Sequence, residues 1–342
     1  MQINTRKNIL ADKETGFNYK NICQRLLKDL PDRAKQIIVR RFGLNGSEGE
    51  TLEAIGKSYG ITRERVRQIE RDGFLKMKTK TADLNNLFDN FRAELEANGG
   101  LAKEEILLEE FGGNKGRNEV FFLLTLNGSL VRFGENKDFY SCWALGQDEL
   151  EKAKKTVDYF VAELRKTKQP FFPGKEEQAV LPVKISSQAL TSYLEASKIV
   201  QRGADGLFGL KEWPEINPRG VKDKAYLVLK KENTPLHFSE VAKRIGENAL
   251  PQTVHNELIR DPRFVLVGRG LYALRSWGYE PGVVKDVIAR ILKVAERPLA
   301  KKEIIEEVLK QRLVKENTIA LNLSDKNHFI RTPEGKYTIR EI

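Results

Sequence analysis

The chain has 342 residues, of which 40% are hydrophobic and 31% are charged. This length exceeds one ordinary hydrophobic core, so it predicts several domains. Its 59 Lys and Arg against 48 Asp and Glu leave a net charge of +11, which favours a polyanionic partner. No apolar run is long enough to cross a membrane, and residues 1–7 lack the apolar stretch of a secretory signal. We therefore expect a cytoplasmic protein without a membrane partner.

Cysteine and histidine usage bears on redox and metal chemistry. Cys23 and Cys142 are far apart in the sequence and are expected to be buried, reduced thiols in different modules. His237, His255 and His328 have no ligand spacing with one another or with cysteine, so no metal is indicated. The carboxylates show no catalytic spacing. The sequence thus predicts no catalytic residue, no enzymatic activity and no cofactor.

An amphipathic helix is predicted over 18–30, and two short helices joined by a tight turn follow within 51–78. Leu52, Ile55 and Tyr59 give the first of these two helices an apolar face. The pair is therefore expected to pack on a common core.

The turn between the two helices carries its own signals. Gly60 is expected to have a positive φ, which is cheapest for glycine. Ile61 is expected to fill the core from the turn, and the Thr62 hydroxyl to accept a hydrogen bond from a free amide of the next helix. Val66 and Ile69 then have the spacing of a buried seam.

The opposite face of the second helix carries five long polar side chains. Their spacing projects them from one stripe, formed by Arg63, Glu64, Arg67, Gln68 and Arg71. An ordinary solvated, charged helix is the alternative. The glycine turn, the cap and the stripe together favour a helix that enters a DNA major groove.

Three segments resemble a known family: Leu30 with Arg33 and Arg41-Phe42-Gly43-Leu44; Thr51-Leu52-Glu53-Ala54-Ile55-Gly56; and Thr62-Arg63-Glu64-Arg65-Val66-Arg67-Gln68-Ile69-Glu70. Together, residues 30–78 resemble region 4 of the housekeeping sigma-70 family of bacterial RNA polymerase sigma factors. In that family, region 4 reads the minus-35 promoter element and docks on the flap of the polymerase β subunit. The resemblance implies a helix-turn-helix fold, double-stranded promoter-like DNA and the RNA polymerase core as partners, and a nucleoid-associated location.

The resemblance also implies two sets of DNA contacts. The residues expected to meet base edges are Arg63, Glu64, Arg67 and Gln68. The residues expected to meet phosphates are Arg33, Arg41, Thr51 and Arg65, with Arg71 added from the polar stripe. No small-molecule ligand is indicated.

The sequence departs from the family in two places. Gly73 lies within the second helix, where glycine costs about 1 kcal/mol relative to alanine, so the helix is expected to end or bend soon after Arg71. Val39 stands where the family often has a basic residue. The match covers about 50 residues, and the 29 residues before it are not expected to form the region that melts the minus-10 element. By itself the chain is not expected to open a promoter.

Charge is unevenly distributed along the chain. Residues 1–80 hold 18 Lys and Arg against 10 Asp and Glu, a net of +8, whereas residues 81–150 hold 6 against 13, a net of −7. DNA phosphates repel an acidic surface. The acidic module is either an ordinary solvated surface or a protein-binding one.

Four strand–turn–strand patterns recur beyond residue 80, within 130–145, 199–210, 264–274 and 329–339. Their aromatic residues Tyr140, Phe208, Tyr272 and Tyr337 lie 68, 64 and 65 residues apart. Such a period predicts an array of like units. Glycine pairs at 112–113 and 268–270 lack the sequence context of a phosphate-binding loop and are expected to form hairpin turns.

The third of these units shows three helical patterns, over 224–231, 239–245 and 251–260, before its hairpin. Ser239 is expected to cap the second helix and Pro251 to occupy the first turn of the third. Three helices followed by a hairpin is the winged-helix plan. Residues 217–279 resemble the HARE-type helix-turn-helix domain, through Thr234-Pro235-Leu236-His237-Phe238-Ser239-Glu240-Val241-Ala242, Thr253-Val254-His255 and the segment from Asp261 to Trp277.

This third unit supplies a second set of candidate DNA contacts: Gln252, His255, Asn256, Arg260 and, at the wing tip, Arg269. An ordinary solvated face explains the same residues equally well. His237 and His255 are interpreted as packing or capping residues.

The sequence as a whole predicts a mainly α fold with small β-hairpins (α+β): a helix-turn-helix domain over 1–80, then about four tandem winged-helix domains over 81–148, 149–215, 216–280 and 281–342. The predicted function is a sequence-specific, sigma factor-like DNA-binding protein of bacterial transcription initiation that contacts RNA polymerase. Two alternatives stay open: an operator-binding regulator independent of polymerase, and a DNA-binding subunit of a restriction or repair nuclease.

Overall fold

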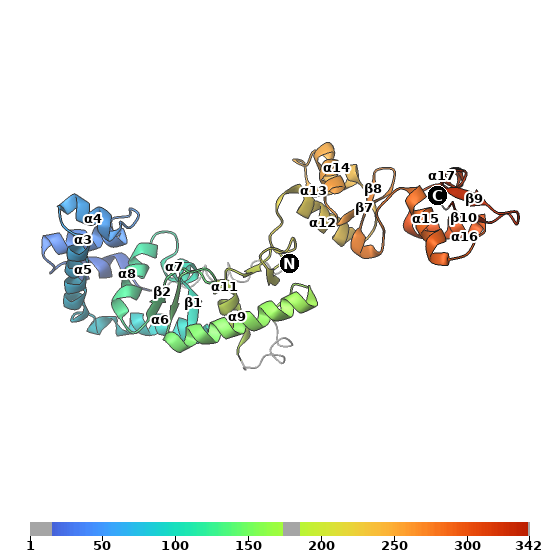
Figure 1. Cartoon of the computed structure of the whole chain (residues 1–342). Coiled ribbons are helices and arrows are strands. Elements are labelled where there is room, and N and C mark those ends of the chain that lie inside the picture. Colours follow the sequence, from blue (N-terminus) through green and yellow to red (C-terminus); the bar gives the residue numbers. More distant parts are fainter. Residues whose placement is uncertain (1–15, 174–184, 341–342) are drawn as a thin grey trace. The chain divides into compact units, whose positions relative to one another are not determined.

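The computed structural model of the chain describes residues 16–173 and 185–340. The fold is mainly helical with small antiparallel sheets, which confirms the expected α+β class. The chain divides into two compact units, Met1–Glu212 and Trp213–Ile342 (Figure 1). The secretory-signal prediction and the first residues of the domain expected over 1–80 lie outside the described residues.

The first unit contains nine of the described helices and a single-turn 3-10 helix over Ala82–Leu84. The helices are α2 (Tyr19–Leu27), α3 (Asp32–Phe42), α4 (Leu52–Tyr59), α5 (Arg63–Lys78), α6 (Asn85–Ala97), α7 (Glu104–Gly112), α8 (Arg117–Asn127), α9 (Gln147–Thr167) and α11 (Ser187–Ala196). The strands are β1 (Leu101–Lys103), β2 (Val131–Phe133), β3 (Cys142–Ala144), β4 (Val200–Arg202) and β5 (Phe208–Leu210).

One hydrophobic core crosses residue 80, the boundary expected between the first two domains. It joins α2, α3 and α5 to α6, α7 and α8 through buried residues from Tyr19 to Trp143. Phe122 of α8 is fully buried, and its ring lies 5.3 Å from that of Phe42 on α3 and 5.6 Å from that of Phe74 on α5. The helices before and after residue 80 therefore form one packed body.

The rest of the first unit is built on two small antiparallel sheets, one with strand order β1-β3-β2 and one formed by β4 and β5. Helix α11 packs on β1, where the Ser192 hydroxyl donates to the Leu101 carbonyl at 2.7 Å. The hydroxyl of Tyr193 donates to the Gly99 carbonyl at 2.5 Å. These two bonds tie α11 to the chain at the start of β1.

The second unit contains α12 (Gly220–Glu232), α13 (Phe238–Ile245), α14 (Pro251–Arg260), α15 (Val284–Ala295), α16 (Lys301–Gln311) and α17 (Glu316–Leu323). Its strands are β6 (Leu236–His237), β7 (Phe264–Gly268), β8 (Leu271–Leu274), β9 (Phe329–Arg331) and β10 (Tyr337–Ile339), with a 3-10 turn over Arg275–Trp277. Separate buried clusters hold α12–α14 with β7 and β8, and α15–α17 with β9.

The same order of elements recurs along the chain. The segments from α6 to β3 and from α12 to β8 both consist of a helix, a short strand, two helices and a hairpin. Their sheets have matching strand orders, β1-β3-β2 and β6-β8-β7. In α15 to β10 the short strand is reduced to a bridge between Leu299 and Tyr337. All four predicted hairpins are present as antiparallel strand pairs.

Several local predictions need correction. Tyr140 lies before β3, which begins at Cys142, so the aromatic residue on that strand is Trp143. Ser239 lies inside α13, whose N-cap is His237, because the imidazole Nδ1 is 3.4 Å from the Ser239 amide nitrogen that donates to it. Helix α12 begins four residues before the predicted start at residue 224.

The structure also tests the predictions made for the Gly112-Gly113 pair and for the two cysteines. Gly112 ends α7 and Gly113 follows it as the C-cap with φ of 52°, so this pair terminates a helix and does not form a hairpin turn. Cys23 and Cys142 are free and buried, as expected, but both lie in the first unit. Burial raises the pKa of the Cys142 thiol to about 11 and raises that of Cys23 further.

Candidate nucleic-acid interface

The candidate interface is a helix-turn-helix built from α3, α4 and α5. Ile37, Ile55 and Val66, one from each helix, are fully buried against one another. Leu52, Tyr59, Ile61 and Ile69 pack around them while remaining partly exposed. The predicted apolar faces of α4 and α5 are confirmed. Their small core sets the angle between the two helices.

Caps and glycines fix the turn between α4 and α5. The Thr51 and Thr62 hydroxyls accept hydrogen bonds from the amides of Ala54 and Arg65 at 3.1 and 3.2 Å, which caps both helices as predicted for Thr62. Gly60 has φ of 63°, the left-handed conformation expected of it. At Gly56 a Cβ atom would lie 2.7 Å from the Ile61 carbonyl oxygen, so only glycine fits the close approach of the helix to the turn.

Helix α5 does not end after Arg71, contrary to the prediction made from Gly73, but continues to Lys78. Gly73 is buried, and a Cβ atom there would lie 2.8 Å from Cδ1 of Ile38. Glycine thus allows α5 to approach α3 closely, and the packing offsets its low helix propensity. Val39, the other departure from the family, packs against the core of the unit.

The polar stripe of α5 lies on its surface. Arg63, Glu64, Arg67 and Arg71 are exposed, and Gln68 is partly exposed. Arg63 and Arg71 make no hydrogen bond or ion pair within residues 16–173 and 185–340. The four residues predicted to read bases are thereby brought together on one exposed face.

Within this face, Glu64 and Arg67 bind each other. The Arg67 Nε and Nη2 atoms donate to the Glu64 carboxylate at 2.9 and 2.6 Å. This contact holds the pKa of Glu64 below its usual range and raises that of Arg67. A second pair joins Arg65 Nη1 to Gln68 Oε1 at 3.1 Å. Both pairs are exposed, so DNA can replace them at little cost in folding stability.

The residues predicted to contact phosphates fall into two environments. Thr51, Arg65 and Arg71 are exposed, and Arg33 is exposed with its guanidinium 5.5 Å from the centre of the Tyr59 ring. Arg41 is only half-exposed: its Nη1 donates to the Glu50 carbonyl at 2.9 Å, and its Nε lies 3.9 Å from Glu70. The structure gives Arg41 an internal role in holding the α3–α4 loop.

Arg40 also holds the α3–α4 loop, although it was not among the predicted site residues. Its Nε and Nη2 donate to the two Glu50 carboxylate oxygens at 2.7 and 2.6 Å, and its Nη1 donates to the Ser58 hydroxyl at 2.7 Å. This contact lowers the pKa of Glu50. A pair ten residues apart across a loop matches no helical or strand period, so no local pattern could have indicated it.

Helix α8 also holds this loop. The Asn118 amide nitrogen donates to the carbonyls of Gly43 and Ser47 at 2.9 and 3.0 Å, across more than 70 residues of sequence. Together with Arg40 and Arg41, it fixes the segment that leads into α4. The interface is thus supported from the acidic module.

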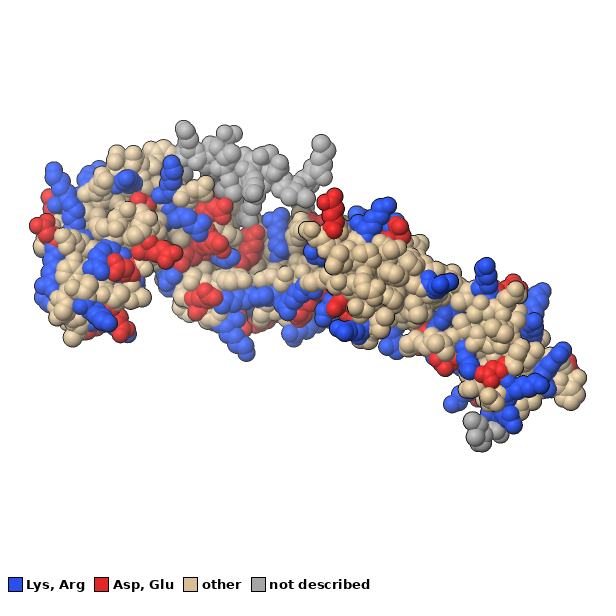
Figure 2. Space-filling model, turned by 90° about the horizontal axis from the view of Figure 1, so that it is seen from above, with Lys and Arg blue, Asp and Glu red and all other residues tan. Residues whose placement is uncertain are grey.

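Charge separates the two parts of this body. Figure 2 shows Lys and Arg exposed over the part formed by α3 to α5 and acidic side chains gathered over the neighbouring part of the same unit. The charges match the net +8 of residues 1–80 and the net −7 of residues 81–150. DNA phosphates are attracted to the first and repelled by the second.

The candidate contacts of the second unit are only partly on the surface. Gln252, Asn256 and Arg260 are exposed on α14, and Arg269 is exposed in the turn between β7 and β8. His255 is partly buried and stacks on the Phe238 ring at 4.4 Å. Its predicted packing role is therefore observed, and three exposed polar residues of α14 remain for a ligand.

Within the described residues, no group of three or more His, Cys, Asp or Glu side chains could hold a metal ion. No helix of the described part has the length and apolar character needed to span a bilayer.

Geometry and family comparison agree on the class of this region. A capped helix-turn-helix with an exposed polar face is the arrangement found in DNA-binding helix-turn-helix domains, and residues 26–79 match the family "Sigma-70, region 4". Region 4 is a DNA-binding, non-enzymatic domain, so residues 26–79 are a DNA-binding, sigma-like region.

A particular relative shows how far the similarity extends. The chain is 46% identical over 55 residues to the RNA polymerase sigma factor RpoS of Coxiella burnetii, and this segment covers 16% of each chain. The chain thus spans about one sixth of the length of this curated relative.

Proposed function

We propose that the exposed face of α5 reads a short duplex element resembling the minus-35 box of bacterial promoters. The observation that carries the proposal is the grouping of Arg63, Glu64, Arg67 and Gln68 on one surface of a capped helix-turn-helix. An Arg can bind guanine O6 and N7 with two hydrogen bonds, Gln can pair with adenine, and Glu can accept from a cytosine amine. The phosphate contacts proposed for Arg33, Thr51, Arg65 and Arg71 supply affinity and register. Arg41 holds the α3–α4 loop from within.

Contact with the RNA polymerase core, through the β flap, is the second part of the proposal. Region 4 of sigma-70 factors has DNA and RNA polymerase as its general partners. In this chain the region is joined to further folded segments. We propose that the protein acts in transcription initiation as a sigma-like DNA reader.

The segments after residue 80 are proposed to be about four tandem winged-helix units, with the third of the HARE type. The recurring order of helix, short strand, two helices and hairpin supports this assignment. Gln252, Asn256, Arg260 and Arg269 would add DNA contacts without strong sequence preference. Linking weakly binding modules raises overall affinity through effective concentration.

Selection of bound fragments from a random duplex library, with and without core RNA polymerase, tests the proposal. We expect one enriched element, relaxed at one base pair in Arg63→Ala and at another in Arg67→Ala. Arg33→Ala is the matched control, because loss of a phosphate contact weakens binding to all sequences alike. Equal enrichment of all sequences would contradict the reading role. Failure of the chain to bind core polymerase would leave an operator-binding regulator instead.

A further inference from the structure

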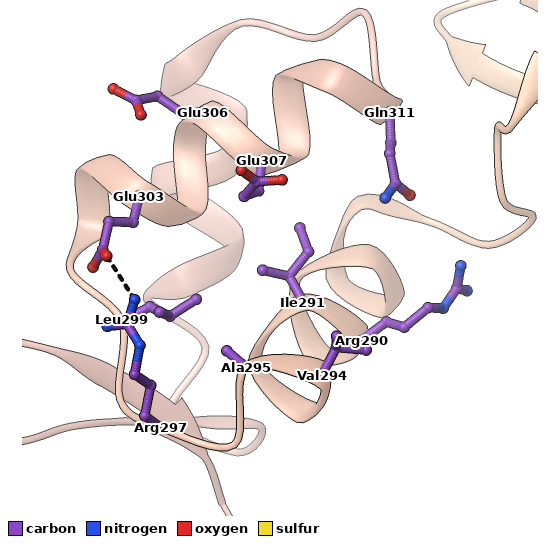
Figure 3. A pocket seen from close by; sticks show the side chains of 10 residues that line it. All are labelled: Arg290, Ile291, Val294, Ala295, Arg297, Leu299, Glu303, Glu306, Glu307 and Gln311. Carbon is purple, nitrogen blue, oxygen red and sulfur yellow. Dashed lines mark hydrogen bonds and ion pairs between the residues drawn. The ribbon is translucent and has the colours of Figure 1, made fainter.

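A groove of about 420 Å³ lies between α15 and α16 in the second unit (Figure 3). Its apolar lining comes from Ile291, Val294 and Ala295 on α15 and Leu299 in the connection to α16. Val294 is 79% exposed, although it stands beside a partly buried apolar floor. An apolar surface of this kind gains stability when a partner covers it.

The two ends of the groove differ. At one end Arg297 Nη2 donates to Glu303 Oε1 at 3.1 Å, and the Glu303 carboxylate also accepts the Ala300 amide at 2.7 Å (Figure 3). Glu303 therefore belongs to the cap of α16, and the amide contact is the main cause of its lowered pKa. This end is closed by the protein's own bonds.

At the other end lie Arg290 of α15 and Gln311 of α16 (Figure 3). Within the described residues, Gln311 Oε1 is buried and accepts no hydrogen bond. Arg290 Nη1 is buried and donates none, although it lies 3.4 Å from a Glu280 carboxylate oxygen. The Arg290 guanidinium is already held by this ion pair and by donation of its Nη2 to the Pro281 carbonyl at 3.1 Å. Buried polar atoms are normally hydrogen-bonded, so Gln311 Oε1 is the atom with capacity for a ligand. A peptide backbone carries the complementary N–H donor.

Charge distinguishes a protein ligand from DNA. Three glutamates, Glu303, Glu306 and Glu307, lie along the α16 side of the groove. Glu306 makes no ion pair within the described part of the chain, and Glu307 pairs only with the exposed Lys310 at 2.6 Å. This acidic edge lies in a segment, 281–342, whose net charge is +4 from 13 Lys and Arg against 9 Asp and Glu. Arg297 and Lys310 pair with Glu303 and Glu307, so Glu306 is the carboxylate that would repel a phosphate and attract a basic side chain.

We propose that this groove binds a segment of a partner protein that inserts an apolar side chain and carries Lys or Arg beside it. The apolar side chain lies against Val294 and Ile291. A backbone N–H of the segment donates to Gln311 Oε1, and its basic residue pairs with Glu306. The groove belongs to the second unit of the chain, and the α5 face belongs to the first.

A phage-displayed library of random peptides, selected on the whole chain, tests the proposal. We expect enriched peptides with an apolar residue flanked by Lys or Arg. The affinity of the strongest synthetic peptide should fall about tenfold or more in Val294→Asp, as for a central interface anchor, and several-fold in Glu306→Lys. Leu321→Asp and Glu316→Lys are matched controls, because both positions are exposed on α17 and neither lines the groove.

Several results would overturn the proposal. They are the absence of enriched peptides, a preference for acidic peptides, and equal binding to Val294→Asp and the unchanged chain. Self-association that Val294→Asp abolishes in sedimentation would assign the groove to a second copy of the chain. Loss of DNA binding in Val294→Asp or Glu306→Lys would assign it to DNA. Val294 is largely exposed, so its variant should unfold at the same temperature as the unchanged chain, which thermal melting checks.

Discussion

Arg67→Ala is expected to change DNA recognition much more than folding. The Arg67 and Glu64 side chains are 50% and 57% exposed, so water screens their ion pair and it contributes little to folding stability. A bidentate contact with a guanine discriminates by about 1–3 kcal/mol, or roughly five- to 150-fold in affinity. Glu64→Ala should cause part of the same loss, because in the chain without DNA Glu64 holds two of the nitrogen atoms of Arg67 and keeps its guanidinium ordered on the exposed face.

Fluorescence anisotropy with the selected duplex and its single-base variants measures the effect, and thermal unfolding measures stability. We expect Arg67→Ala to equalise the affinities at one base pair, and the double variant with Glu64→Ala to lose less than the sum of the single losses. A uniform loss at every base, with a smaller salt slope, would show that Arg67 contacts phosphate and refute the assignment. A fall in unfolding free energy above about 1 kcal/mol would show that the pair is structural.

Three further changes test the support of the interface. Gly56→Ala should destabilise the helix-turn-helix by about 1–3 kcal/mol, because its Cβ atom would lie 2.7 Å from the Ile61 carbonyl oxygen. Gly60→Asn is the control and should be tolerated, because the space around Gly60 is open and Asn accepts a positive φ. Denaturant unfolding compares the two variants. Phe122→Ala should cost about 3–5 kcal/mol and weaken DNA binding with it, because its ring joins α8 to α3 and α5; equal unfolding midpoints would contradict the shared core. Burial raises the pKa of Glu70, so its contribution to stability is present below the unfolded-state pKa and is lost as pH rises through the folded-state value. Glu70→Gln should therefore stabilise the fold at neutral pH and flatten this dependence in melts at several pH values.

The exposed polar face of α5 could be predicted because each of its signals is local. Thr62 caps, Gly60 turns and Val66 is buried according to rules that span four residues or fewer. The same rules misjudged Gly73, since helix propensity contains no term for the Ile38 side chain that lies against it. Tertiary packing overrode the local preference.

The support beneath the face could not be predicted. Asn118 holds a loop more than 70 residues earlier, and Phe122 completes the core of helices that precede residue 80. Neither contact corresponds to a helical or strand period in the sequence. The change of net charge near residue 80 suggested a domain boundary. Charged residues lie on the surface, however, and the buried apolar core continues across residue 80. Surface composition and core connectivity are independent properties of a chain.

The shared core gives the acidic module a defined place beside the reading face. A flexibly linked acidic segment would only lower the affinity for DNA, because it could approach phosphates from any direction. Here α8 is fixed to α3 and α5 by the Phe122 ring and to the α3–α4 loop by Asn118. If a duplex binds as proposed, this fixed repulsion acts from one side and restricts its approach to the α5 face. Loosening α8 should therefore reduce the preference for the selected element and leave non-specific binding less affected.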